Sequence, residues 1–153
     1  MSDNILEGKF TWFTQKELEN GQIIPVDLYP NIIPTATILD ALRTEIGEPI
    51  YINSTYRDPL YNKAVGGAKN SLHLKFNAID FSIKRDSSTF KMASISSIYA
   101  ILKDFDKKGF IYPDFGLKTS IMGLGLYLRG MSSFIHLDTR STLGRKAPAR
   151  WIG

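Results

Sequence analysis

The chain has 153 residues, of which 43% are hydrophobic and 22% charged, values that suit one globular domain over residues 1–153. It contains no cysteine, which excludes disulfides, thiolate metal sites and a cysteine nucleophile, so a transition metal would need histidine and carboxylate ligands. The formal net charge of +4 favours anionic partners, such as nucleic acid, anionic lipid or cell-wall polymer, without distinguishing among them.

The N-terminal segment has no basic residues followed by an apolar run, so it does not resemble a secretory signal peptide. No stretch approaches the roughly 18 consecutive apolar residues of a membrane-spanning helix. We therefore expect a protein that is cytoplasmic on synthesis and has no membrane span. If it acts outside the cell, another factor must release it. The sequence leaves the oligomeric state open, and we expect a monomer.

The first third of the chain carries two helix signals on either side of a proline-rich stretch. Thr14-Gln-Lys-Glu17 reads as a capping box that opens a short helix. Residues 22–34 contain three prolines and are expected to be irregular. A second helix should run from Thr35 or Thr37 to about Ile46, because apolar residues repeat there at helical spacing.

From the middle of the chain onward, strand and helix signals alternate. They predict a short strand over 50–54, a short helix over 58–65, a buried strand over 78–83, a long helix over 88–105, and a hairpin made by 125–128 and 134–138. The rest of the glycine-rich last third reads as strands and turns. This order predicts an α+β fold, a small single domain with a mostly antiparallel sheet.

Two histidines and one carboxylate form the candidate metal-binding set. His73 and His136 are the only histidines, and with Asp80 they would leave a fourth coordination position open, which is typical of catalytic zinc and also suits Fe(II). Alternate residues of a strand share a face, so His136 and Asp138 should point the same way. A carboxylate amid apolar residues is costly unless paired or metal-bound, but a hydrogen-bonded core Asp is the commoner case. The pattern alone leaves both interpretations open.

Several motifs follow one another along the chain. They are Ser54-Thr-Tyr-Arg57-Asp-Pro, Tyr61-Asn62, Val65-Gly-Gly-Ala68, Ser71-x-His73, Ala78-x-Asp80, Phe134-Ile-His136-Leu-Asp138 and Arg150-Trp151. Taken in order, these motifs resemble the M15 family of zinc peptidases, the group of D-Ala-D-Ala carboxypeptidases and L-alanyl-D-glutamate endopeptidases. The resemblance covers about residues 36 to 151. The last two motifs resemble the family's branch of small phage and bacterial cell-wall peptidases.

The resemblance implies a fold and residue roles. The fold would be the small α+β domain that these peptidases share with the hedgehog signalling domain. His73, Asp80 and His136 would be the ligands of Zn²⁺. Arg57 would lie near the metal and stabilise the oxyanion, although an ordinary surface ion pair is its alternative interpretation. Ser71 would support the site by hydrogen bonding, unless it is a simple turn or cap hydroxyl.

The chain departs from the family pattern at two positions. Phe76 stands where the motif usually has glycine, three residues after its first histidine. Ser133 stands where many members carry an acidic general base, three residues before the last histidine. Asp138 is the candidate substitute for that base, and its alternative role is a partner that orients His136. The sequence does not separate these two roles.

We therefore expect a zinc-dependent peptidase that cuts an amide bond of peptidoglycan, most simply a phage endolysin acting on the cell wall after release, with no nucleic-acid partner. A virion or tail component that binds or digests the wall is the alternative. A non-haem iron oxygenase is a third possibility, but it needs a histidine after His136, and the sequence has none.

Overall fold

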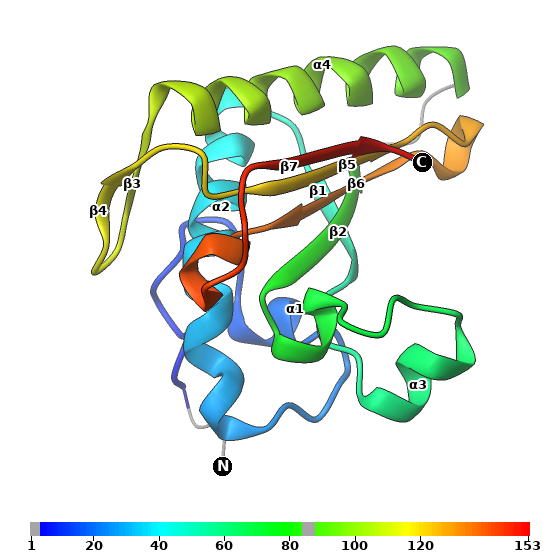
Figure 1. Ribbon diagram of the computed structural model, residues 1–153. Helices are drawn as coiled ribbons and strands as arrows, with labels where there is room; N and C mark the ends of the chain where they lie inside the picture. Colours follow the sequence, from blue (N-terminus) through cyan, green and yellow to red (C-terminus); the bar gives the residue numbers. More distant parts are fainter. Residues whose placement is uncertain (1–3, 84–87) are drawn as a thin grey trace.

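The computed structural model describes residues 4–83 and 88–153. Its main sheet has five strands in the order β1-β2-β6-β5-β7, drawn in Figure 1. The strands are β1 (Ile50–Ser54), β2 (Ala78–Ile83), β6 (Phe134–Asp138), β5 (Gly123–Tyr127) and β7 (Ala149–Ile152). Neighbouring strands are antiparallel except β5 and β7, which run parallel. Helices with a mixed, mostly antiparallel sheet confirm the predicted α+β class.

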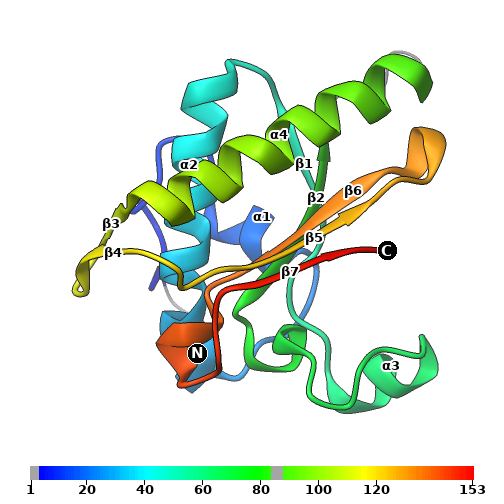
Figure 2. The same cartoon turned by 45° about the horizontal axis from the view of Figure 1, so that its top comes forward.

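Two helices, α2 (Ile33–Ile46) and α4 (Ser88–Lys108), contact the sheet and each other. Figure 2, turned by 45°, shows α4 crossing α2 on one side of the strands. The residues between the helices and the sheet form one apolar core, in which Ile79 and Phe81 of β2 and Ile135 and Leu137 of β6 are completely buried. Because side chains alternate along a strand, the residues between these four point to the opposite face.

The pairing register of β2 and β6 decides which residues meet on that opposite face. Asp80 lies directly across from His136, and Ala78 lies across from Asp138. On the other side of β6, Gly125 of β5 is the partner of His136. The sheet therefore brings a carboxylate and an imidazole together in its middle, although they are 56 residues apart in the chain.

The N-terminal region confirms one prediction and corrects another. Helix α1 (Gln15–Glu19) starts with the expected capping box, in which Thr14 and Glu17 exchange side-chain hydrogen bonds with each other's backbone N–H. The proline-rich stretch is not irregular, because a 3-10 helix, η1, covers Val26–Ile32, and α2 begins directly after it, before Thr35. Pro34 lies in the first turn of α2, where proline's fixed φ and missing N–H cost nothing.

The remaining elements complete the frame around the site. Asp58 caps the short helix α3 (Pro59–Ala64), and a 3-10 helix, η2 (Leu72–Lys75), leads into β2. Helix α4 continues to Lys108, beyond the predicted end, and a two-stranded sheet of β3 (Phe110–Tyr112) and β4 (Gly116–Lys118) follows it. The sequence predicted strands and turns in this part of the chain, but not the β3–β4 hairpin or the pairing of β7 with β5. Across 4–83 and 88–153, no helix has both the length and the apolar character needed to cross a bilayer.

Candidate metal centre

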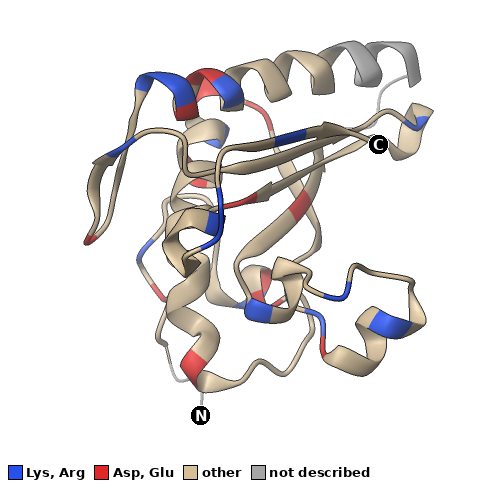
Figure 3. Ribbon diagram, viewed as in Figure 1, with Lys and Arg blue, Asp and Glu red and all other residues tan. Residues whose placement is uncertain are grey.

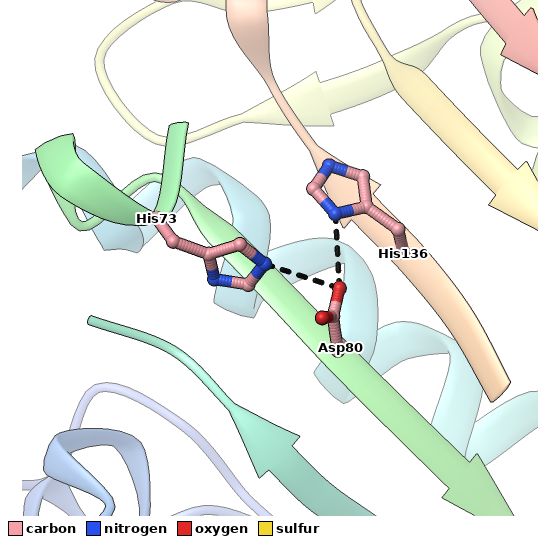
Figure 4. Close-up of side chains that lie close together, drawn as sticks. All are labelled: His73, Asp80 and His136. Atoms are coloured by element: carbon pink, nitrogen blue, oxygen red, sulfur yellow. Dashed lines mark hydrogen bonds and ion pairs between the residues drawn. The ribbon is translucent and has the colours of Figure 1, made fainter. Parts of the chain in front are cut away.

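Three side chains predicted as metal ligands lie together on the face of the sheet opposite the core. Figure 4 shows the imidazoles of His73 and His136 directed at one carboxylate oxygen of Asp80. His73 Nε2 lies 3.2 Å and His136 Nδ1 lies 2.9 Å from Asp80 Oδ1. The potential ligand atoms of the three residues all lie within 4.8 Å of one another. They come from η2, β2 and β6, so the fold rather than the local sequence assembles this cluster.

His73 is held in one tautomer by the backbone. Its Nδ1 lies 2.7 Å from the carbonyl oxygen of Thr55, which can only accept a hydrogen bond, so Nδ1 carries the proton. Nε2 is then the lone-pair nitrogen; it is buried and, among the described residues, has no hydrogen-bond partner despite its closeness to Asp80. Ser71 caps η2 by accepting a hydrogen bond from the backbone N–H of His73 at 3.2 Å. Both contacts fix the direction in which Nε2 points.

His136 lies between two carboxylates. Its Nδ1 faces Asp80, while its Nε2 is 2.7 Å from Oδ2 of Asp138. Burial lowers the pKa of His136, but the hydrogen bonds to Asp138 and Asp80, together with their charges, outweigh burial and raise that pKa to about 9. A hydrogen bond from Nε2–H to Asp138 directs Nδ1 toward the centre of the cluster.

Asp138 is completely buried, and both of its oxygens are engaged. Oδ1 accepts from the backbone N–H groups of Gly123 and Arg140, at 3.1 and 3.0 Å, and from Arg140 Nε at 3.0 Å. Oδ2 accepts from His136 at 2.7 Å and from Arg140 Nη2 at 2.8 Å. Burial raises the pKa of Asp138, but the hydrogen bonds from His136 and Arg140 hold it well below its usual range. The carboxylate is therefore ionised, and both of its oxygens contact Arg140.

Arg57 lies at the edge of the cluster. Its Nη2 is 3.5 Å from Asp80 Oδ2, and its Nη1 is 3.4 Å from the side-chain oxygen of Asn62. Its backbone N–H donates to the carbonyl of His73 at 3.1 Å, so the loop before α3 is tied to η2. Gly67 makes the approach possible, because a Cβ there would lie 2.1 Å from Asn62 Oδ1 and 3.1 Å from Arg57 Nη1. The structure thus brings Arg57 beside Asp80 and ties it to η2.

The cluster has the donor set of a zinc site, and the two distances from its imidazole nitrogens to Asp80 fit the spacing of such a site. Ligand atoms about 2.0–2.1 Å from a tetrahedral zinc ion lie about 3.4 Å apart, close to the 3.2 and 2.9 Å between each imidazole nitrogen and Asp80 Oδ1. The unpartnered lone pair of His73 Nε2 faces the same point. Burial raises the pKa of Asp80, but the hydrogen bond from His136 Nδ1 and the positive charge beside it lower that pKa below its usual range, so the carboxylate is ionised and ready to bind a cation.

An aromatic group around Trp151 covers His136. The indole of Trp151, from the parallel strand β7, lies 5.2 Å from the imidazole, and its Nε1 donates to Tyr127 Oη at 2.8 Å. Tyr127 stacks on Phe134, with ring centroids 4.4 Å apart. Gly125 leaves space for the indole, since a Cβ there would lie 2.3 Å from Trp151 Nε1.

The two departures from the family pattern have different structural meanings. Phe76 ends η2 in the left-handed conformation, with φ +52°, which explains why glycine suits this position. Its ring is buried and packs edge-on against Tyr29, and that burial offsets the backbone cost. Ser133 is buried in the turn between β5 and β6, where its hydroxyl donates to Gly130 O at 2.7 Å and accepts from Arg129 N–H at 2.8 Å. Ser133 thus shapes the turn.

The cluster opens into a cleft of about 500 Å³. Four arginines line it, whereas among the described residues its only carboxylates are Asp80 and Asp138. The lining residues are Arg57, Gly66, Gly67, Ala68, Asn70, Ser71, Leu72, His73, Asp80, Tyr127, Arg129, Phe134, His136, Asp138, Arg140 and Arg145. Thr55 and Arg140 are contacts that the sequence interpretation missed, whereas the Arg150-Trp151 motif had already pointed to Trp151.

Comparison with protein families gives one match. The family model described as Peptidase M15 matches residues 11–111, about two thirds of the chain. That segment includes Arg57, His73 and Asp80, whereas His136 and Asp138 lie after it. No curated protein matches the chain. The structure therefore brings His136 and Asp138, which lie outside the matched segment, together with His73 and Asp80, which lie within it.

Proposed function

The chain belongs to the peptidase M15 family, and from that premise we propose that it is a zinc-dependent peptidase that hydrolyses an amide bond of peptidoglycan. Family membership supports a peptidase that acts on peptidoglycan. The observation that carries the zinc dependence is the convergence of His73 Nε2, Asp80 Oδ1 and His136 Nδ1 at the bottom of the cleft. Zinc, when bound, lowers the pKa of a coordinated water to roughly 7 and polarises a carbonyl.

The protein's own residues position the ligands and the substrate. The Thr55 carbonyl and the Asp138 carboxylate hold the N–H groups of His73 and His136, so His73 Nε2 and His136 Nδ1 stay directed at the same point, where a bound metal would take the place of the Nδ1 proton of His136. Arg57, beside Asp80, donates to the substrate's carbonyl oxygen and stabilises the negative charge that develops on it.

Asp138, on this proposal, is a positioning residue. A general base needs an oxygen that can reach the water and accept its proton. Both oxygens of Asp138 already accept hydrogen bonds, from His136, Arg140 and Gly123, and the side chain is completely buried. The geometry therefore favours the orienting role over the role of proton acceptor.

The biological setting that we propose is lysis of the bacterial cell wall by a phage endolysin. It rests on the resemblance of the closing motif around His136, and of Arg150-Trp151, to small phage and bacterial cell-wall peptidases. The same chemistry would serve an enzyme carried on the virion. Co-purification of the protein with phage particles would favour the virion-associated alternative.

The test combines metal analysis with product analysis. Purified protein is incubated with peptidoglycan, with and without chelator and added zinc, and the products are identified by mass spectrometry. We expect chelator-sensitive release of stem peptides, and the new termini name the bond. Asp80→Asn should lose both zinc and cleavage, whereas Asp104→Asn, at a half-exposed carboxylate on α4, should lose neither. Cleavage that survives chelation, or a zinc-loaded protein that cuts nothing, would overturn the proposal.

A further inference from the structure

The cleft carries more positive charge than its own carboxylates neutralise. Arg140 pairs with Asp138 at 2.8 Å, and Arg57 lies 3.5 Å from Asp80. Two further arginines line the cleft, and among the described residues neither has an acidic partner. Arg129 lies over the rings of Tyr127 and Phe134, at 5.2 and 5.8 Å. Arg145 donates to the backbone carbonyl of Asn70 at 2.6 Å.

These two arginines lie on opposite sides of the metal centre. His136 is in the middle of β6, facing Gly125 of β5. Arg129 follows β5 beyond the end that carries Tyr127, about 13 Å along the chain from Gly125 at about 3.3 Å per residue. Arg145 follows β6 beyond the other end. In Figure 3, blue segments of the ribbon lie at both ends of this strand pair.

The surroundings of both arginines leave their guanidinium groups available to a ligand. Arg129 is exposed, and its contact with stacked aromatic rings orients the planar group without neutralising it. Arg145 is half-buried, and one hydrogen bond to Asn70 leaves its other N–H groups unused among the described residues. A planar guanidinium with free donors binds a carboxylate with two parallel hydrogen bonds.

We propose that Arg129 and Arg145 each bind a carboxylate of the substrate, one on either side of the amide bond that is cut. The substrate class is then a peptide with free carboxylates flanking the scissile bond, as opposed to its amidated counterpart. This inference rests on the proposed function and specifies the substrate of the same site. It makes Arg129 and Arg145 specificity residues, separate from the ligands and from Arg57.

The test uses synthetic stem peptides in matched pairs, in which the carboxylate on one side or the other of the cleaved bond is free or converted to an amide. For the wild-type protein, amidation on either side should raise KM about 10- to 100-fold, as expected for loss of one charge-assisted pair, and leave kcat nearly unchanged. Arg129→Gln should lose this discrimination on one side only, and Arg145→Gln on the other. Arg43→Gln is the matched control, because Arg43 lies over the ring of Trp12, at 4.6 Å, outside the cleft.

The outcomes separate the inference from the proposed function. Equal KM values for the free and amidated peptides with the wild-type protein would overturn the inference and leave the peptidase intact. If zinc-loaded protein cuts neither the peptides nor peptidoglycan, the proposed function fails. Calorimetric titration of the same peptides then still decides the inference. Tighter binding of the carboxylate forms, lost in the two variants, supports it, and equal affinities overturn it.

Discussion

Replacing Asp138 with Asn separates the two roles open to this residue. Asn has nearly the same shape but only one acceptor oxygen, and its amide group is a donor. In the native site, Oδ1 and Oδ2 together accept from His136, from Gly123 and from the backbone and side chain of Arg140. An amide nitrogen in the place of Oδ2 would face two donors, His136 Nε2–H and Arg140 Nη2–H.

The magnitude follows from these contacts. Each charge-assisted hydrogen bond contributes about 1.5–3 kcal/mol, and breaking a buried ion pair costs about 3–5 kcal/mol, so we expect Asp138→Asn to destabilise the fold by about 3–5 kcal/mol. The amide can recover one bond by donating to Nε2 of His136, but the imidazole proton must then move to Nδ1. That nitrogen faces Asp80, so the exchange removes the lone pair required by a metal ion. Zinc affinity should fall about 10- to 100-fold.

Three measurements on this variant decide between the roles. Urea denaturation gives the free energy of unfolding, competition with a chromogenic chelator gives zinc affinity, and cleavage at saturating zinc gives kcat. An orienting residue affects all three. If Asp138→Asn folds and binds zinc like the wild type while kcat falls a thousandfold, Asp138 is the general base and our reasoning is refuted. Asp104→Asn serves as the control for a carboxylate outside the site.

Three further substitutions test the packing around the site and the core. Gly125→Ala would place a Cβ 2.3 Å from Trp151 Nε1, so the indole must shift. We expect about 1–3 kcal/mol of destabilisation, altered tryptophan fluorescence and a lower kcat/KM. Unchanged emission and activity would contradict this expectation. Gly67→Ala would displace Asn62 and the neighbouring Arg57, so kcat should fall while zinc content, measured by elemental analysis, stays the same; loss of zinc would show a different cause. Burial, and then the charge of Asp106, raises the pKa of Tyr112, whose buried Oη has no hydrogen-bond partner among the described residues. The folded-state pKa therefore exceeds the unfolded value of about 10, so the free energy of unfolding of the wild type should fall as the pH rises above that value. Tyr112→Phe should be about 1–3 kcal/mol more stable at pH 7, because it removes the unpaired hydroxyl, and it should lose less stability at alkaline pH. Urea denaturation of both proteins at pH 7 and at alkaline pH measures these free energies, and equal losses of stability in wild type and variant would contradict the prediction.

The parts of the fold and site that depend on side-chain pattern could be predicted from the sequence. The capping box at Thr14 sets the start of α1, and the alternation around Asp80 and His136 gives the face that each occupies. Strand alternation also placed Asp138 on the same face as His136. These predictions held because each depends on local chemistry or on the two-residue period of a strand.

The contacts that were missed depend on backbone groups or on long-range pairing. The backbone carbonyl of Thr55 fixes His73, whereas the Thr55 side chain donates to Leu18 O. Any residue type would offer the same carbonyl, so a threonine at position 55 does not indicate the contact with His73. Strand β7 pairs parallel to β5, and no turn signal links the two, so the position of Trp151 over His136 could not be derived. Proline content made residues 22–34 look irregular. In the structure, however, Pro25 precedes η1, Pro30 lies within η1 and Pro34 lies in the first turn of α2, and the backbone is ordered at all three.

Different residues fill the core and line the exposed part of the cleft, which matters for engineering this protein. Residues such as Ile79 and Leu137 fill the core, whereas exposed cleft positions such as Asn70 and Arg129 contribute little to it. Substitutions at exposed positions usually change stability by less than about 0.5 kcal/mol. A combinatorial library restricted to exposed cleft positions could therefore vary what the cleft binds, with most members still folded.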